Sequence, residues 1–397
     1  MHGYLLPVDA ARLAFVIGIV VSLVLYERRH LSTGSVVVPG YIGAFMLSPL
    51  ILVVTLVNAV AVHLLVGRVA ARWAGLHGRN KFTALALCSV SLQLISLQLM
   101  PHVSASLYGI GFMIPGLIAH DMARQGVRRT AVAILGTGIA VGSFALAVVS
   151  VLPFVAGGRP VTGQPAPLVL DSTWVPFAAL FAVIAASALF SNYGLRSGGF
   201  IGGMYLGLLA TDLAAVALLV IVALVTWIVV TRLFQANLVL FGRRKFAAML
   251  LVSSSLSWFV VTLFEQGVGG DHWSSSPLST MVLVPLFVPG LLANDVERAG
   301  LWRTALGTAL AIAFVFSWSR LAAGSVTRGS FPVLIAVAVI STAIAFGPQI
   351  AWMARSLRAS WPRRYGIGDP ARSGARDKAG LASVVRMDGE RRAGVSA

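Results

Sequence analysis

Residues 78–82 read Gly-Arg-Asn-Lys-Phe, and residues 242–246 repeat the pattern as Gly-Arg-Arg-Lys-Phe, 164 positions further along the chain. Residues 115–131 recur in the same way at 289–305, where 10 of 17 positions are identical and the offset is 174. Self-similarity at a nearly constant spacing indicates a tandem duplication. The two copies must form similar structures, so the duplication determines how the rest of the chain is interpreted.

The copies occupy residues 8–153 and 173–321, with a Gly/Pro-rich linker at 154–172 that we place outside the membrane. Each copy contains six apolar runs. Because six is even, both copies enter the membrane in the same orientation, as parallel repeats. A further apolar run at 331–354 predicts a final transmembrane helix. The basic segment that follows, 355–397, has the polar composition of a disordered tail.

The composition excludes a soluble protein of this length. Apolar residues make up 58% of the 397 residues and charged residues 11%, against about 25% charged in a typical soluble domain. The mean hydropathy is +0.88. The longer apolar runs approach the ~20 residues that a helix needs to cross a bilayer. We therefore predict an all-α polytopic membrane protein, embedded in the lipid bilayer.

The positive charge, +17 in total, is concentrated in particular loops. Segments 67–81 and 232–245 contain Arg and Lys but no acid, and the tail is also basic, whereas 265–277 contains two acids and no cation. Basic loops face the cytoplasm in membrane proteins. The pattern predicts thirteen crossings of a bacterial cytoplasmic membrane, with the amino terminus outside and the carboxyl-terminal tail inside. It also accounts for the charge without nucleic acid as a partner.

Four apolar runs, 36–47, 107–119, 199–210 and 280–293, are too short for ordinary spans. Several contain Pro-Gly, which interrupts helices, and interrupted helices at membrane depth line cavities in transporters. Tight turns between hydrophobic hairpins are the alternative interpretation. The candidate residues of a broken-helix path are Pro39, Gly40, Tyr41, Gly109, Gly111, Pro115, Gly116, Pro289 and Gly290.

The repeated basic motif is a candidate site for an anion or for a partner protein. Only three lysines occur in the chain, and two of them, Lys81 and Lys245, occupy the matched position beside Arg79 and Arg243. Such cations at the membrane surface can hold a phosphate or a carboxylate. The alternative is that they serve only as positive-inside anchors.

The repeat also conserves an acid and a base three residues apart, Asp121 with Arg124 and Asp295 with Arg298. These residues form a candidate duplicated functional pair, although the spacing also fits an ordinary surface pair on a helix or a helix cap. We find no catalytic constellation, nucleotide-binding motif or metal-ligand spacing, and we expect no cofactor. The single cysteine, Cys88, excludes an intramolecular disulfide.

Both halves resemble the CapC/PgsC family, the polytopic membrane component of bacterial poly-γ-glutamate (capsule) biosynthesis. The motifs that carry the resemblance are at 37–43, 78–82, 109–119, 242–250 and 289–294. Members of the family are usually one such unit long, so this chain resembles a fused pair.

The second half departs from the family pattern at two segments. It has Gly-Gly-Met at 202–204 in place of Pro-Gly, and Leu-Val-Pro at 283–285 in place of Gly-Ile-Gly. If these glycine-rich segments line a site, the two halves are not equivalent.

The resemblance implies a non-catalytic membrane subunit that works beside a soluble ATP-dependent amide ligase (CapB/PgsB-like) and a membrane-anchored subunit (CapA/PgsA-like). Its role would be the synthesis and export of poly-γ-glutamate, with the bond-forming residues in the ligase. The protein would then not be an enzyme by itself. Parallel repeats, interrupted spans and matched cations also fit a second function, a secondary transporter of a small organic anion.

Overall fold

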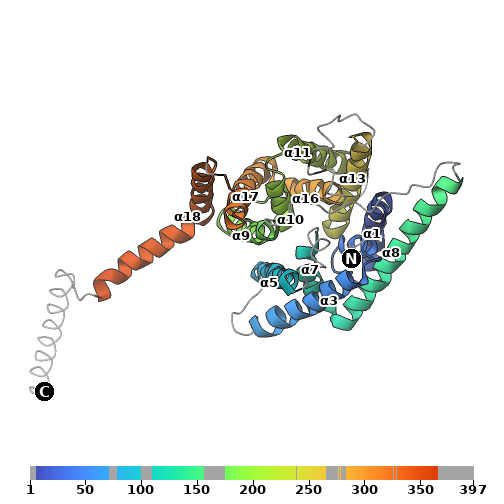
Figure 1. Cartoon of the computed structure of the whole chain (residues 1–397), viewed down its shortest axis with the longest axis horizontal. Coiled ribbons are helices and arrows are strands. Elements are labelled where there is room, and N and C mark those ends of the chain that lie inside the picture. The colour runs from blue at the N-terminus through green and yellow to red at the C-terminus, as the bar shows by residue number, and fades with distance from the viewer. Residues whose placement is uncertain are drawn as a thin grey trace, which may run out of the picture. The chain divides into compact units, whose positions relative to one another are not determined.

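The computed structural model describes residues 6–70, 78–99, 110–155, 175–237, 239–264, 276, 278, 283–324, 326–327 and 329–364. Helices dominate these residues, and none of them lies in a β-strand (Figure 1). Within this part of the chain, eight helices are long and apolar enough to cross a membrane. The prediction of an all-α polytopic membrane protein is therefore confirmed.

The first repeat consists of α1 (Val8–Arg29), α2 (Val38–Ala44), α3 (Pro49–Leu64), η1 (Leu65–Ala70), α5 (Gly78–Leu99), η3 (Ile110–Phe112), α7 (Ile114–Gln125) and α8 (Val127–Val155). The second consists of α9 (Val175–Tyr193), α10 (Gly199–Leu208), α11 (Leu213–Ile228), η4 (Val229–Phe234), α12 (Gln235–Asn237), α13 (Gly242–Leu263), α16 (Val284–Ala299) and α17 (Leu301–Ala322). Corresponding elements follow in the same order. Even the π-helical turns η1 and η4 begin at matched positions, 164 residues apart.

The chain divides into two compact units, Met1–Ala345 and Phe346–Ala397. The last helix, α18 (Phe331–Arg364), begins in the first unit. It continues beyond the end predicted at residue 354 and contains both Pro348 and Pro362. The rest of the predicted tail, most of the linker at 154–172 and nearly all of the acidic segment 265–277 lie outside the described residues.

The segment after α1 returns along α1 as an irregular stretch with bends at residues 34–37, followed by a short helix. The hydroxyls of Ser22 and Thr33 are 2.8 Å apart, and the amide of Leu6 donates to the carbonyl of Ala44 at 3.0 Å. Residues 33–44 therefore run antiparallel to α1, from a point near its last turn to its first residues. The seven residues of α2 cover about 10 Å on their own, so the irregular stretch before it supplies the rest of the length.

Glycine allows α2 to approach its neighbours at backbone distance. A Cβ on Gly40 would lie 2.6 Å from the Cα of Phe15 in α1, and one on Gly43 would lie 3.0 Å from the carbonyl oxygen of Gly138 in α8. Every residue of α2 is buried. A larger residue at Gly40 would have to push the two backbones apart.

The two repeats contact each other through equivalent elements. Helix α1 packs against α13, and its second-repeat counterpart α9 packs against α5. Aromatic rings fill the contact, since Phe82 stacks on Phe200 at 5.7 Å between centroids and Phe15 lies 6.0 Å from Phe287. The arrangement has the approximate twofold relation that parallel repeats produce.

Candidate functional site

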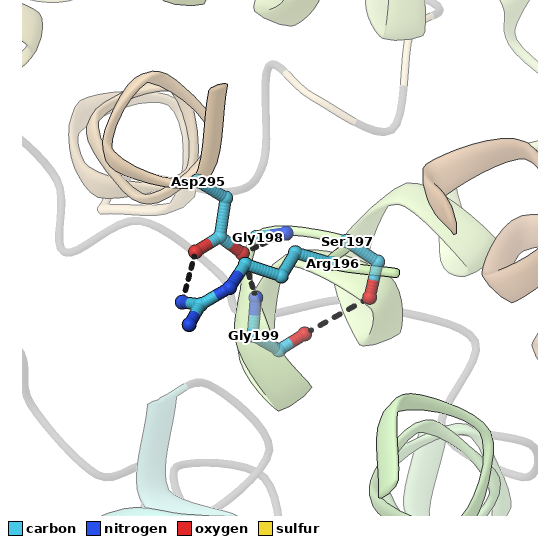
Figure 2. A network of polar contacts seen from close by, with 5 residues as sticks. All are labelled: Arg196, Ser197, Gly198, Gly199 and Asp295. Carbon is cyan, nitrogen blue, oxygen red and sulfur yellow. Dashed lines mark hydrogen bonds and ion pairs between the residues drawn. The ribbon is translucent and has the colours of Figure 1, made fainter. Parts of the chain in front are cut away.

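In the second repeat, the buried carboxylate of Asp295 binds the loop that leads into the short helix α10 (Figure 2). Asp295 of α16 accepts hydrogen bonds from the amides of Gly198 and Gly199 at 3.0 and 3.1 Å. Both glycines have positive φ angles, 72° and 68°, a conformation that other residues adopt with strain. Arg196 completes the cluster, with its Nη1 atom 3.3 Å from the second oxygen of Asp295.

The first repeat builds the same anchor with a different partner. Asp121 of α7 accepts a hydrogen bond from the amide of Gly34 at 2.9 Å and another from the hydroxyl of Ser32. Ser32 corresponds to Arg196 at the repeat offset, so a neutral hydroxyl replaces a guanidinium. Gln125 also binds this loop, accepting from the amide of Ser32 at 3.0 Å.

These contacts explain why the acid is duplicated, and they differ from the pairing that the spacing suggests. Asp121 and Asp295 point toward the loops that precede α2 and α10, whereas Arg124 and Arg298 are exposed. In the described part of the chain neither arginine forms an ion pair. Charge-assisted hydrogen bonds to backbone amides are worth about 1.5–3 kcal/mol each, so the acids act as structural anchors of the broken segments.

The Pro-Gly residues of the first repeat mark helix starts. Pro39 and Pro115 lie in the first turn of α2 and α7, where a missing amide hydrogen costs nothing. Ser89 of α5 braces the second start, because its hydroxyl donates to the carbonyl of Phe112 at 2.8 Å and accepts from the amide of Gly116 at 3.0 Å. The broken-helix path predicted from the sequence is thus occupied, in the first repeat, by short helices whose starts are hydrogen-bonded to neighbouring helices.

Tyr41 and Gly111 face each other inside the first repeat. A Cβ on Gly111 would lie 3.0 Å from the hydroxyl oxygen of Tyr41, and the carbonyl of Gly111 accepts from the side chain of Gln93 at 3.0 Å. Gly109 lies outside the described residues. These contacts leave no open channel between the Tyr41 hydroxyl and Gly111, because the two groups are already close to van der Waals contact.

The second repeat departs from the first at the corresponding helix start. Helix α16 begins at Val284 with Pro285 in its first turn, so Pro289 lies inside the helix. The neighbouring Gly290 still permits close packing, since a Cβ there would lie 3.0 Å from the Leu250 side chain and 3.1 Å from its Cα. Only the first repeat therefore starts its helix at the Pro-Gly pair.

The basic motif of the second repeat reaches across to the first repeat. Both terminal nitrogens of Arg243 donate to the hydroxyl of Ser32 at 3.2 Å, and its guanidinium lies 4.2 Å from the ring centroid of Tyr26. The adjacent Arg244 forms an exposed ion pair with Glu27. The starts of α5 and α13, the end of α1 and the end of α7 thus meet at one end of the helix bundle, which we call the basic end.

The two matched lysines are in different environments. Lys245 forms an ion pair with Glu297, and the same carboxylate accepts from the indole of Trp227 at 2.9 Å. Ala123 takes the place of Glu297 in the first repeat, and Lys81 has no ion pair within the described residues. The side chain of Arg79 lies outside the description.

Two adjacent cavities lie where the repeats meet at the basic end. The first, of about 190 Å³, has polar side chains in its lining, which include Ser32, His120, Asp121 and Arg243. The second, of about 270 Å³, is mainly apolar, although Arg196 and Asp295 are among its lining residues. The aromatic residues that line it come from both repeats: Phe82, Phe200, Phe246 and Phe287. Both cavities share Ser35, Leu117 and Phe246, so the two cavities adjoin each other, and we call the larger one the apolar chamber.

Sequence reasoning missed four residues that shape this site: Ser32, His120, Arg196 and Glu297. Aligning the halves shows Ser32 opposite Arg196 and Ala123 opposite Glu297, which are the differences that alter the local charge. No group of three or more His, Cys, Asp or Glu residues is placed to hold a metal ion in the portion of the chain described.

The fold and this site define a polytopic helical membrane protein with a duplicated, interrupted-helix core. The sequence pattern of the capsule biosynthesis CapC family matches residues 17–131 and again 181–305. The chain therefore belongs to the CapC family, and the two separate matches confirm the tandem duplication.

Two curated relatives each match about a third of this chain. The capsule biosynthesis protein CapC of Bacillus anthracis is 30% identical over 142 residues, 35% of this chain and 93% of that protein. The PGA biosynthesis protein CapC of Bacillus subtilis (strain 168) is 28% identical over 121 residues, 30% of this chain and 81% of that protein. No solved structure matches the chain.

Proposed function

We propose that this protein is a non-catalytic membrane subunit of a complex that synthesises and exports poly-γ-glutamate. Its membership of the CapC family and the names of its relatives support the process. The basic end supports the role, because the basic motif of the second repeat lies there and its Arg243 lines a cavity with several polar side chains. A polymer with one carboxylate per residue is attracted to such a surface.

In this proposal the basic end faces the cytoplasm of a bacterium, with the amino terminus outside and the tail inside. The cations Arg79, Lys81, Arg243 and Lys245 dock a CapB/PgsB-like ligase or receive the growing chain from it. A CapA/PgsA-like subunit completes the assembly in the membrane. The ligase forms the amide bonds and consumes ATP.

The apolar chamber implies that the polymer does not pass through the protein in this conformation. Carboxylates lose their hydration at high cost in a cavity lined by Phe82, Phe200 and Phe287. Export along the junction of the repeats therefore requires these aromatic contacts to separate. The broken segments anchored by Asp121 and Asp295 would form the sides of the path.

Deletion and complementation in a producing bacterium test the proposed function. We expect polymer output to stop without this protein and to return with it, while ligase levels stay unchanged. The detergent-purified protein should neither hydrolyse ATP nor ligate glutamate unless the ligase is added. Turnover by the ligase-free protein, or normal polymer output in the deletion strain, would overturn the proposal.

Labelling of introduced cysteines tests the orientation. With Cys88 replaced by Ala, single cysteines at the exposed residues Asn80 and Arg244 should react only with reagents that enter the cytoplasm. A cysteine in the acidic segment 265–277 should react from outside. The opposite pattern contradicts both the topology and the docking of a cytoplasmic ligase.

A secondary transporter of a small organic anion is the second candidate. The 190 Å³ cavity at the junction of two parallel repeats favours it, because transporters bind substrates between such repeats. Uptake of labelled glutamate by proteoliposomes that contain only this protein distinguishes the two functions. Concentrative uptake supports the transporter, and its absence together with restored polymer output in cells supports the synthesis subunit.

A further inference from the structure

The second repeat neutralises its own basic groups at the basic end. Arg196 is held by Asp295 at 3.3 Å, and Lys245 is held by Glu297, which also accepts from Trp227. Glu297 is only about one-third exposed and Lys245 less still. A ligand carboxylate would have to displace an internal carboxylate in order to reach either cation.

The first repeat leaves its basic groups available. Arg243, supplied by the second repeat, contacts a hydroxyl and an aromatic ring, and no carboxylate lies within ion-pair distance of it in the described residues. Lys81 is likewise without an ion pair there. It precedes Phe82, whose ring contacts the imidazole of His120 edge-on at 5.6 Å between centroids.

The acid in this cavity bonds to the loop before α2 and, in the part of the chain described, not directly to a cation. Asp121 is buried, and its bonds to the amide of Gly34 and the hydroxyl of Ser32 direct it toward the loop. Among the charged groups that act on His120, Asp121 has the largest effect, followed by Arg124 and Lys81. Arg243 and Asp121 both line the cavity of about 190 Å³ and both bond to the hydroxyl of Ser32, so no carboxylate of the described residues contacts Arg243 directly.

We infer that the molecule has one polyanion site, in the first repeat and completed by Arg243 of the second, whereas at the matching position in the second repeat Arg196 and Lys245 are already paired with Asp295 and Glu297. The ligand is a short γ-linked glutamate segment, an assignment that rests on the proposed function. The Arg243 guanidinium binds one carboxylate in the cavity. Lys81, the neighbour of the Phe82 ring that contacts His120 of the cavity lining, binds the next carboxylate of the same chain.

Binding of a fluorescent γ-linked glutamate hexamer to the purified full-length protein tests the site, without the ligase. A γ-linked glutamine hexamer is the matched uncharged probe. We expect one glutamate hexamer per protein chain and no binding of the glutamine hexamer. Lys81→Ala and Arg243→Gln should each weaken the affinity for the glutamate hexamer about tenfold, because each removes one charge-assisted contact. Arg232→Ala should change it less than about twofold, because Arg232 lies elsewhere. Lys245→Ala should weaken it less than Lys81→Ala does, because Glu297 already neutralises Lys245.

An exchange of acids between the repeats gives a second test that does not depend on deleting a contact. Ala123→Glu places beside Lys81 the carboxylate that neutralises Lys245, at an exposed position that tolerates a longer side chain. It should reduce hexamer affinity at least as much as Lys81→Ala. The reciprocal Glu297→Ala should not reduce binding, because it only releases Lys245. Thermal unfolding of each variant verifies that it is folded.

The outcomes separate this inference from the proposed function. Two hexamers per chain, or equal sensitivity to Lys81→Ala and Lys245→Ala, overturns the single site. No binding of the hexamer by a protein that restores polymer output also overturns the site and leaves the proposed function standing. One hexamer bound with the expected sensitivities supports the site, even if the protein fails to restore polymer output, a failure that would count against the proposed function alone.

Discussion

Asp295 in the second repeat has a guanidinium beside it, whereas Asp121 in the first repeat has the hydroxyl of Ser32 at the matching position. Lys245 is paired with Glu297, whereas Lys81 lies near Ala123 and has no ion pair in the residues described. The shared parts of the repeats anchor the broken helices. The residues that differ decide whether a cation forms an ion pair within the protein or remains available to bind a partner. The comparison teaches that duplication preserved the scaffold while the charges around it diverged.

Neutralising all four motif cations should have the largest effect of the changes considered, a loss of polymer output. Arg79→Gln, Lys81→Gln, Arg243→Gln and Lys245→Gln together remove charges that attract a nearby anion by roughly 1 kcal/mol each. Polymer output should fall more than about a hundredfold, while the protein still inserts because Arg68, Arg72, Arg232 and Arg244 remain. Polymer yield and membrane-fraction blots check this. Normal output at normal protein levels would reduce the motif to a membrane anchor.

Testing the matched lysines of that variant one at a time sharpens the comparison. Neutralising only Lys81 should reduce polymer output more than neutralising only Lys245, whose charge Glu297 already balances. The same polymer assay measures both. Equal losses would mean that the ion pair in the second repeat opens when the ligase binds.

Gly40→Ala should cause the largest loss of stability among single changes. The new Cβ would lie 2.6 Å from the backbone of Phe15, and overpacking of this kind costs about 1–3 kcal/mol. Gly136→Ala in α8 is the matched control, because nothing lies within 4 Å of its Cβ position. Thermal unfolding in detergent should separate the two, and equal melting temperatures would show that α2 is not held against α1.

Asn substitutions at the anchoring acids should destabilise the second repeat more than the first. Asp295→Asn leaves the partly buried Arg196 without its carboxylate, a loss we place at about 2 kcal/mol, between the values for exposed and fully buried pairs. Asp121→Asn should cost about 1 kcal/mol, because Ser32 and Gly34 keep an oxygen acceptor. Urea unfolding monitored by tryptophan fluorescence compares them. A larger loss for Asp121→Asn would contradict the assignment of Arg196 to Asp295.

The smallest effect is expected at the exposed contact between the repeats. Arg244→Ala removes the ion pair with Glu27, whose side chains are 59% and 35% exposed. Such surface pairs contribute about 0.2–1 kcal/mol, so unfolding should change little and polymer output should be retained. A large loss of stability would show that this pair, rather than the aromatic contacts, holds the repeats together.

The repeat, the apolar spans and the matched lysines could be read from the sequence because each depends on local composition or spacing. The role of Asp121 could not, because its partner Gly34 lies 87 residues away and is brought close only by the interrupted segment before α2. The position of Arg243 depends on contact between repeats, which no periodicity specifies. The spacing of Asp121 and Arg124 predicted a local pair, but burial of the acid against backbone amides is the stronger interaction.

The crossing of Arg243 from one repeat to the loop of the other has a consequence for assembly. A chain with a single repeat would need a second molecule to supply that arginine, so its competent form would depend on how many copies the membrane holds. Here the peptide linkage keeps the donor at a high effective concentration, and the junction forms within one molecule. Its formation should therefore not change when the protein is diluted in detergent or lipid, whereas an unlinked pair would dissociate.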